Sequence, residues 1–297
     1  MPCDHGLLSA QFVNVQGRQR EAKGVLSDSH SRKCVLHVRL QARNYRFVHV
    51  TWCYRRLALI CVSVLTTIMS GSKAFETIAS IIYTHIKSHT PVIRPRQASP
   101  LFVALQGPQG SGKTSLLERV NEMLAQNDED HIPRRVATLS IDDLYLPHAQ
   151  LKALSSAHPD NPFLRGRGLP GTHDIPLGLS LLRSLKEINC SGANSIRIPR
   201  FDKSLFDGEG DRLPESEWTE VKRPLDIVLL EGWCVGFYPQ SRQYIEERFV
   251  DVPSVLDGTL DTSAYSLEHV LDMNRRVAEY TEWWDLFDIC LQVCSRL

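Results

Sequence analysis

One segment constrains the fold of this chain more than any other part of the sequence. Residues 107–114 read GPQGSGKT and match the pattern GxxxxGK(S/T), whose glycines let backbone N–H groups converge on phosphate oxygens. The apolar run Leu101–Leu105 precedes this segment, and apolar residues at helical spacing follow it to about Gln126. Strand, glycine-rich turn and helix in that order predict a phosphate-binding loop. The alternative is a turn that only connects strand and helix, and the complete match in this context disfavours it.

The roles expected within this loop follow from residue type. Lys113 supplies a mobile positive charge for the β- and γ-phosphates of a nucleotide, and Thr114 offers a hydroxyl to Mg²⁺. The helix that starts near Gly112 adds the positive end of its dipole. The residues expected to bind ATP are Gly107, Pro108, Gln109, Gly110, Ser111, Gly112, Lys113, Thr114 and Ser115.

The rest of the chain alternates between predicted strands and predicted helices. The strands are expected at 101–105, 136–141, 195–198, 227–230 and 287–293, and further helices at 73–88, 176–188, 241–248 and 266–284. Two long stretches rich in Pro and Gly, 147–174 and 199–224, are predicted to be functional or mobile loops. Strands that alternate with helices predict βαβ units on a mainly parallel sheet. We therefore expect an α/β fold, the three-layer sandwich of P-loop NTPases.

Acidic residues follow two of the predicted strands. Asp142 and Asp143 come after the strand at 136–141, and Glu231 comes after the strand at 227–230. Because the carboxyl ends of parallel strands line the ligand crevice, these acids should face the phosphate-binding loop. Glu231 suits Mg²⁺, and Asp142 suits a general base that takes the proton of a hydroxyl acceptor. The alternatives are turn or helix-cap acids for the Asp pair and a solvated carboxylate for Glu231.

Charge and hydropathy give no sign of a nucleic-acid or membrane partner. The 34 basic and 34 acidic residues cancel, and the strongest apolar run, Leu57–Met69, has 13 residues, short of the ~20 that span a bilayer. The cysteines, without a CxxC pair, are predicted to be free thiols in a reducing compartment. We expect a cytoplasmic protein that acts on a small molecule; the sequence indicates no particular protein partner. A GTPase is disfavoured because no NKxD string occurs.

Residues 1–68 differ from the rest of the chain. They hold ten Lys or Arg and three Asp or Glu, a net charge of +7, and show neither helical nor strand periodicity. Three interpretations remain open: an organellar transit peptide, a disordered basic arm, or a gene-model artefact with Met69 as the true start. The first of these would place the protein in an organelle.

Several motifs together resemble one family. In chain order they are GPQGSGKTS, SIDDLY at 140–145, RGRGLPGTHD at 165–174, IPRFDKS at 198–204 and LLEGW at 229–233. Over roughly 73–293 the chain resembles the D-glycerate 3-kinase-like family, which belongs to the P-loop kinases with uridine kinase, phosphoribulokinase and bacterial pantothenate kinase. The resemblance implies a P-loop kinase domain at 99–297, after a basic extension at 1–68 and an N-terminal helix and linker at 69–98.

The resemblance also implies site residues. Asp142 takes the place of the acid proposed as general base in these kinases, with Tyr145 beside it at the acceptor pocket. Asp174 corresponds to an acid that contacts the acceptor, and Glu231 to the strand-end acid near Mg²⁺. Asp174 has an alternative interpretation as the N-cap of the helix that follows it. His173 is expected to be a loop or packing residue.

Cations in the two long stretches suit an anionic acceptor such as glycerate. They are Arg165, Arg167, Arg200, Lys203 and Arg212, of which the first two and Lys203 are the predicted acceptor contacts. The alternative for any one of them is a solvated charge or a contact to the γ-phosphate. A nucleoside acceptor would require stacking surfaces and amide groups, in which these stretches are poor.

The sequence therefore predicts a kinase that uses ATP and Mg²⁺ to phosphorylate a hydroxyl of a small anionic acceptor, with Asp142 and Lys113 as catalytic residues. Related kinases continue past the strand at 287–293 into a basic lid and a terminal helix, whereas this chain stops at Leu297. The domain is thus expected to be incomplete at its C-terminus. The alternatives are a catalytically impaired ATP-binding protein that acts through partners, and a kinase for a nucleoside.

Overall fold

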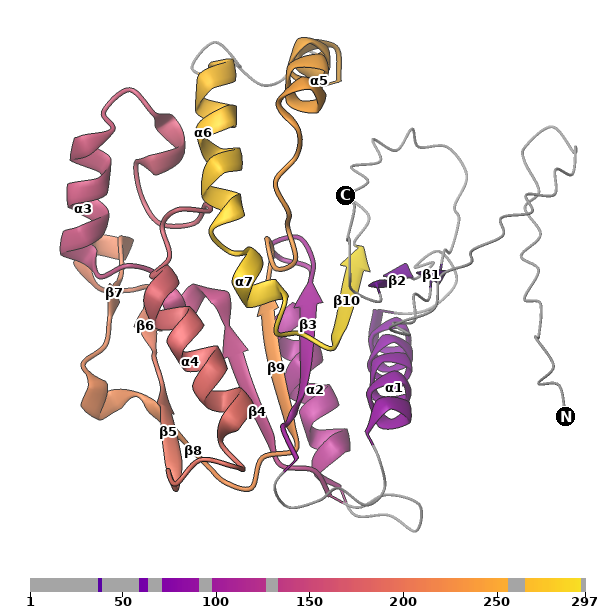
Figure 1. The fold of residues 1–297 in the computed structure, drawn as a ribbon. Helices are drawn as coiled ribbons and strands as arrows, with labels where there is room; N and C mark the ends of the chain where they lie inside the picture. Colours follow the sequence, from indigo (N-terminus) through magenta and orange to yellow (C-terminus); the bar gives the residue numbers. More distant parts are fainter. Residues whose placement is uncertain are drawn as a thin grey trace, which may run out of the picture. The chain divides into compact units, whose positions relative to one another are not determined.

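A parallel sheet forms the centre of the computed structural model drawn in Figure 1. The structure describes residues 37–38, 59–63, 71–90, 98–126, 133–255 and 265–294. The strands of the sheet are β1 (His37–Val38), β2 (Leu59–Ser63), β3 (Leu101–Gln106), β4 (Val136–Ser140), β9 (Ile227–Gly232) and β10 (Ile289–Cys294). Their order is β1-β2-β10-β3-β9-β4, and every neighbouring pair is parallel. The predicted α/β class with a mainly parallel sheet is confirmed.

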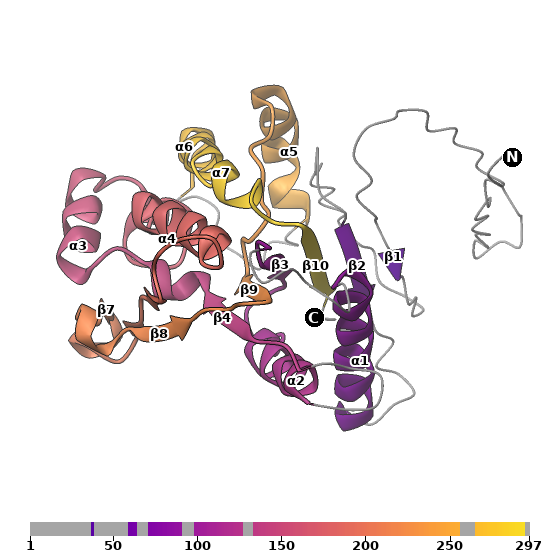
Figure 2. The same ribbon diagram turned by 60° about the horizontal axis from the view of Figure 1, so that its bottom comes forward.

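Helices flank this sheet on both faces. They are α1 (Gly71–His89), α2 (Lys113–Ala125), α3 (His148–Ala157), α4 (Ile175–Glu187), α5 (Arg242–Val255), α6 (Leu267–Ala278) and α7 (Thr281–Trp284). Figure 2 shows α1 and α2 on one face of the sheet and α4 and α7 on the other. The result is the three-layer arrangement expected of a P-loop NTPase.

Side chains of β3 alternate between the two cores. Phe102 and Ala104 pack on the side of α4 and α7, whereas Val103 and Leu105 pack on the side of α1 and α2. Both faces of the strand are buried, which explains why the sequence has a continuous apolar run here and no apolar–polar alternation. The strand therefore anchors the loop that follows it to both layers of helices.

The packing of α4 against α7 leaves no room for a side chain at Gly178. A Cβ there would lie 2.1 Å from Cζ2 of Trp283, a residue that is completely buried. Replacing a helix-interior glycine with alanine normally stabilises by about 1 kcal/mol. Here we expect Gly178→Ala to lower the free energy of unfolding, measured in denaturant, by about 1 to 3 kcal/mol. The steric overlap of the new Cβ with Trp283 outweighs the gain in helix propensity. Ser180→Ala, at an exposed position of α4, is the control, and equal stability of the two variants would contradict this packing.

One predicted strand does not join the central sheet. β5 (Ser195–Ile198) pairs antiparallel with β8 (Thr219–Lys222) in a separate two-stranded sheet. In β5 the exposed Arg197 lies between two isoleucines, the alternation of a half-exposed antiparallel strand. The segment predicted as a strand at 195–198 is thus a strand, but it lies outside the mainly parallel central sheet.

The two long stretches are more ordered than the sequence predicts. The first contains α3 and a 3₁₀ helix at Pro162–Leu164. Only Leu151 is buried in α3, so the helix has little apolar periodicity to detect. The second contains a hairpin of β6 (Phe201–Asp202) and β7 (Asp211–Arg212), and 3₁₀ helices at Phe206–Gly208 and Glu215–Glu217.

Several predicted boundaries shift. The predicted helix at 266–284 is divided into α6 and α7, because Tyr280 between them is buried and its hydroxyl accepts a hydrogen bond from Gly171 N. The predicted helix at 241–248 extends to the end of α5. The strand predicted at 136–141 ends at Ser140, whose side chain caps the 3₁₀ helix Ile141–Leu144.

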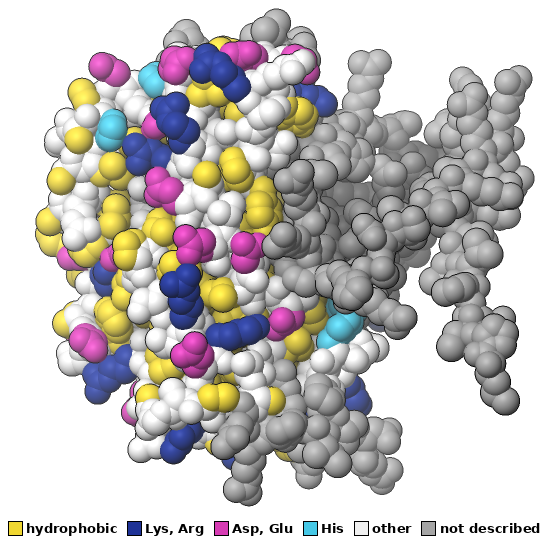
Figure 3. Space-filling view, in the orientation of Figure 1, with side chains coloured by type: hydrophobic (Ala, Val, Ile, Leu, Met, Phe, Trp, Pro, Cys, Tyr) yellow, Lys and Arg dark blue, Asp and Glu magenta, His cyan; other side chains and the backbone are white. Residues whose placement is uncertain are grey.

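Most of the predicted basic extension, residues 1–36, 39–58 and 64–68, lies outside the described residues. Its segments 37–38 and 59–63 are the strands β1 and β2. Within the described part of the chain, no helix is both long and apolar enough to cross a membrane. On the face drawn in Figure 3, Lys and Arg side chains are interspersed with Asp and Glu side chains.

Candidate functional site

The loop between β3 and α2 has the backbone of a phosphate cradle. Gly110 and Gly112 have φ of 73° and 77°, values that residues other than glycine rarely adopt. The helix α2 begins at Lys113 without a side-chain cap, so its first N–H groups are open to an anion. The Oγ of Ser111 is buried without a hydrogen-bond partner in the described part of the chain. These features fit a bound phosphate chain.

Lys113 is held within this loop. Its Nζ donates a hydrogen bond to the carbonyl oxygen of Pro108 at 2.8 Å. Burial lowers the pKa of Lys113 from its ordinary value, although the nearby carboxylates Glu231 and Asp142 oppose this change. The ammonium is therefore close to both strand-end acids.

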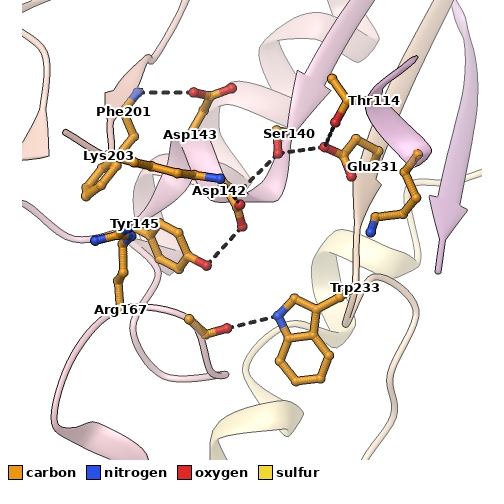
Figure 4. Close-up of polar contacts among 12 residues, drawn as sticks. Thr114, Ser140, Asp142, Asp143, Tyr145, Arg167, Phe201, Lys203, Glu231 and Trp233 are labelled. Carbon is orange, nitrogen blue, oxygen red and sulfur yellow. Dashed lines mark hydrogen bonds and ion pairs between the residues drawn. The ribbon is translucent and has the colours of Figure 1, made fainter. Parts of the chain in front are cut away.

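Glu231 joins the loop to the strand ends, as Figure 4 shows. Its Oε1 accepts hydrogen bonds from the Thr114 hydroxyl at 3.3 Å and from the Ser140 hydroxyl at 3.0 Å. β4 and β9 are neighbours, and their register places Ser140 opposite Glu231. One carboxylate and two hydroxyls are oxygen ligands of the kind that Mg²⁺ takes beside phosphates. The sequence prediction missed Ser140, although its place at the end of β4 could have indicated it.

Asp142 is held by two hydrogen bonds from side chains. Its Oδ1 accepts from the Tyr145 hydroxyl at 2.9 Å and its Oδ2 from Lys203 Nζ at 2.5 Å (Figure 4). Burial acts to raise the pKa of Asp142, but Lys203 and then Tyr145 outweigh burial, and the pKa lies below its ordinary value. The carboxylate is thus ionised and has defined partners on both oxygens.

The neighbouring Asp143 has a different environment. Its Oδ1 accepts a hydrogen bond from the backbone N–H of Phe201 at 3.1 Å, which fastens β6 to the 3₁₀ helix. Burial raises the pKa of Asp143 above its ordinary value, against the hydrogen bonds from the backbone. The two acids predicted as a pair therefore separate into one that faces a cavity and one that faces the backbone.

A cavity of about 410 Å³ lies against Asp142. Its lining residues are Gln109, Asp142, Tyr145, His148, Leu151, Lys152, Arg165, Gly166, Arg167, Gly168, Lys203 and Glu209. Gln109 belongs to the phosphate-binding loop, so the cavity reaches the cradle. The structure brings together four of the five predicted acceptor contacts, namely Tyr145, Arg165, Arg167 and Lys203.

Asp174 is the predicted acceptor contact that does not line this cavity. Its Oδ1 caps α4 by accepting from Leu177 N at 3.0 Å, and its Oδ2 pairs with Arg212 at 3.0 Å. The N-cap interpretation therefore describes its contacts. The sequence prediction missed six of the lining residues, and the ionisable ones among them are His148, Lys152 and Glu209.

His173 supports Tyr145 from behind. Its ring stacks on the Tyr145 ring with centroids 4.4 Å apart, and its Nδ1 lies 2.7 Å from the Tyr280 hydroxyl. Burial lowers the pKa of His173 to about 3, so the ring is neutral. The expectation of a packing residue agrees with these contacts.

The Lys203 contact predicts a pH effect. In Lys203→Met the carboxylate of Asp142 loses its cationic partner while burial persists, so its pKa should rise. If Asp142 acts as the base, the acid limb of the kcat/KM profile should move to higher pH. Lys152→Met is the control, because Lys152 bonds Glu209 instead and should leave the limb in place. An unmoved limb in Lys203→Met would contradict the assignment.

Comparisons with known proteins agree with this architecture. A solved structure of D-glycerate 3-kinase from Cryptococcus neoformans var. grubii is 36% identical, with a TM-score of 0.60 over 73% of this chain and 71% of that one. The chain belongs to the D-glycerate 3-kinase-like family of P-loop kinases. Among curated relatives of the family, the chloroplastic D-glycerate 3-kinase of Arabidopsis thaliana is 31% identical over 63% of this chain. A protein of Saccharomyces cerevisiae named "Probable ATP-dependent kinase" is 39% identical over 47% of this chain.

The alignments to these curated relatives span less than half of the length of each relative. The matched part of the chain covers 36% of the Arabidopsis protein and 47% of the yeast protein. No family model matches the chain. The assignment to the D-glycerate 3-kinase-like family thus rests on individual relatives and on the solved structure.

Proposed function

We propose that this protein is an ATP-dependent kinase that phosphorylates a hydroxyl of a small anionic acceptor, with D-glycerate as the first candidate. One observation carries the proposal. A carboxylate with a lowered pKa, Asp142, lies between the phosphate cradle and a cavity lined by Lys and Arg side chains. A phosphoryl donor on one side and a hydroxyl acceptor on the other would meet at this group.

The residues around the loop would hold the nucleotide and its metal. The first-turn N–H groups of α2, the Ser111 hydroxyl and Lys113 would bind phosphate oxygens of ATP. Thr114 and Glu231 would hold Mg²⁺, which neutralises phosphate charge when bound. Lys113 would exchange its contact with Pro108 for the phosphates.

Asp142 would take the proton of the acceptor hydroxyl. In the reaction that we propose, the hydroxyl oxygen bonds to the γ-phosphorus, ADP leaves with the electron pair of the broken P–O bond, and the proton passes to Asp142. Tyr145 and Lys203 orient the carboxylate by donating to its two oxygens. The hydrogen bond from Trp233 Nε1 to Gly168 O, at 2.9 Å, joins the Arg165–Gly168 part of the cavity lining to the end of β9.

The lining of the cavity favours an anionic acceptor. Arg165 lines it and makes no side-chain hydrogen bond to the residues that the structure describes. Tyr145 is the one Phe, Tyr or Trp among the lining residues, and its ring is covered by His173. A nucleobase would find little surface for stacking at such a site.

The test is a coupled assay with D-glycerate, other hydroxy acids, glycerol and nucleosides as acceptors. We expect phosphorylation of a hydroxy acid, and we expect Arg165→Ala to raise the KM of that acceptor by about tenfold, because a charged hydrogen bond is lost. Arg183→Ala is the control, since Arg183 is exposed on α4 and pairs with Glu282. Phosphorylation of uridine or cytidine alone would overturn the acceptor class. ATP binding without turnover on any acceptor would support the catalytically impaired alternative.

A further inference from the structure

A second group of charges lies on the α3 side of the cavity. Oε2 of Glu209 lies 2.6 Å from His148 Nε2, and its Oε1 lies 2.9 Å from Lys152 Nζ. All three side chains line the same cavity as Asp142. A carboxylate of the chain itself therefore takes the two hydrogen-bond donors that α3 presents to the acceptor cavity.

Glu209 belongs to the loop that also carries Lys203. Residues 203–210 connect β6 to β7, so one hairpin loop places Lys203 on Asp142 and Glu209 on α3. Both ends of this loop are anchored, because Asp211 accepts a hydrogen bond from His148 N at 2.8 Å and Phe201 N donates one to Asp143 at 3.1 Å. Movement of the loop between its anchors would change both contacts.

The backbone of this loop is strained at two residues. Phe206 and Asp207 have φ of 52° and 54°, values that residues other than glycine seldom adopt. The Phe206 ring stacks on His148 at 3.9 Å, yet the residue is 54% exposed. Contacts to α3, together with hydrogen bonds from Arg167 to the carbonyl oxygens of Gly208 and Glu209, therefore hold a conformation that the backbone disfavours.

We propose that Glu209 stands in for the anionic group of the acceptor. When no acceptor is bound, its carboxylate occupies His148 and Lys152, and a carboxylated acceptor displaces it and takes these donors. His148 and Lys152 are then the residues that select an anionic acceptor. This inference rests on the proposed function and adds to it a binding subsite and a loop that responds to the acceptor.

The exchange is favourable only for an anion. The side chains of Lys152 and Glu209 are 60% and 50% exposed, so water can replace their contact at little cost. A carboxylated acceptor restores the lost ion pair with its own carboxylate. A neutral polyol leaves Lys152 without an anionic partner, so it gains nothing by displacing Glu209.

The experiment measures binding of D-glycerate and of glycerol by calorimetry, in the presence of a non-hydrolysable ATP analogue. Glu209→Gln should bind D-glycerate about two- to fivefold more tightly than wild type, since the competing charge is gone. Lys152→Met should bind D-glycerate about three- to tenfold more weakly and leave glycerol unaffected. In the double variant the gain in affinity from Glu209→Gln should largely disappear, because the Lys152 ammonium that Glu209 would otherwise occupy is already absent.

Glu282→Gln is the matched control, an exposed carboxylate that pairs with Arg183 on the surface and should change nothing. Thermal unfolding checks that each variant is folded. Weaker or unchanged D-glycerate binding in Glu209→Gln would overturn the inference. The contacts of Glu209 with His148 and Lys152 would then only stabilise the fold. Failure of the proposed function has a different signature, namely no phosphoryl transfer to any acceptor by the wild-type protein.

Discussion

Replacing Asp142 with Asn should lower kcat by about 100-fold or more, because the amide keeps the shape of the carboxylate but cannot accept a proton. Affinity for Mg²⁺ and ATP should persist, since the phosphate contacts come from the loop between β3 and α2. The measurement is steady-state turnover on the acceptor found in the screen, together with nucleotide binding on the same preparation.

Asp143→Asn is the matched control for this variant. An asparagine there can still accept the hydrogen bond from Phe201 N, so the hairpin should stay attached and turnover should stay near the wild-type level. The reverse result, with loss of turnover in Asp143→Asn and full turnover in Asp142→Asn, would show that Asp143 is the base and would overturn the assignment to Asp142.

Lys113→Ala should abolish most of the stabilisation that Mg²⁺ and ATP confer on the folded protein. A ligand at 100 times its Kd stabilises a protein by about 2.7 kcal/mol, and this gain depends on binding to the native state alone. Lys113 is buried in the loop beside Glu231 and Asp142, so its loss leaves the phosphate charge without its cation. The measurement is the thermal shift as a function of nucleotide concentration.

Lys222→Ala provides the control, because Lys222 is exposed on β8 and pairs with Glu220 at the surface. Its thermal shift with nucleotide should equal that of the wild type. An equal shift in Lys113→Ala would show that the nucleotide binds elsewhere, and the site assignment would then fail. A lower melting temperature without nucleotide in either variant would not affect this comparison, since each shift is measured against its own baseline.

The glycine-rich loop of the candidate site could be predicted because local sequence encodes it. Glycines at positive φ, a strand before them and a helix after them are all properties of one continuous segment. Glu231 and Asp142 could be placed nearby because parallel strands bring their carboxyl ends to one edge. The sequence by itself thus determined the cradle, its lysine and the two acids that face it.

The cavity side of the candidate site was decided by tertiary structure. Lys203 and Asp142 are 61 positions apart, as are His148 and Glu209, and no periodicity links such pairs. Their contacts depend on how the β6–β7 hairpin packs against α3. These two elements have few buried apolar residues, so the sequence pattern concealed them.

The range of an interaction along the chain separates what the sequence determined from what it left open. Hydrophobic periodicity and turn chemistry are short-range signals, and they place the strands, the glycine-rich loop and the acids at strand ends. Asp174 shows the other case, because its sequence allowed both an acceptor contact and a helix cap. The cap contact from Leu177 N is local in sequence, whereas only packing brought Arg212 to the other oxygen, since long-range contacts are set by the whole fold.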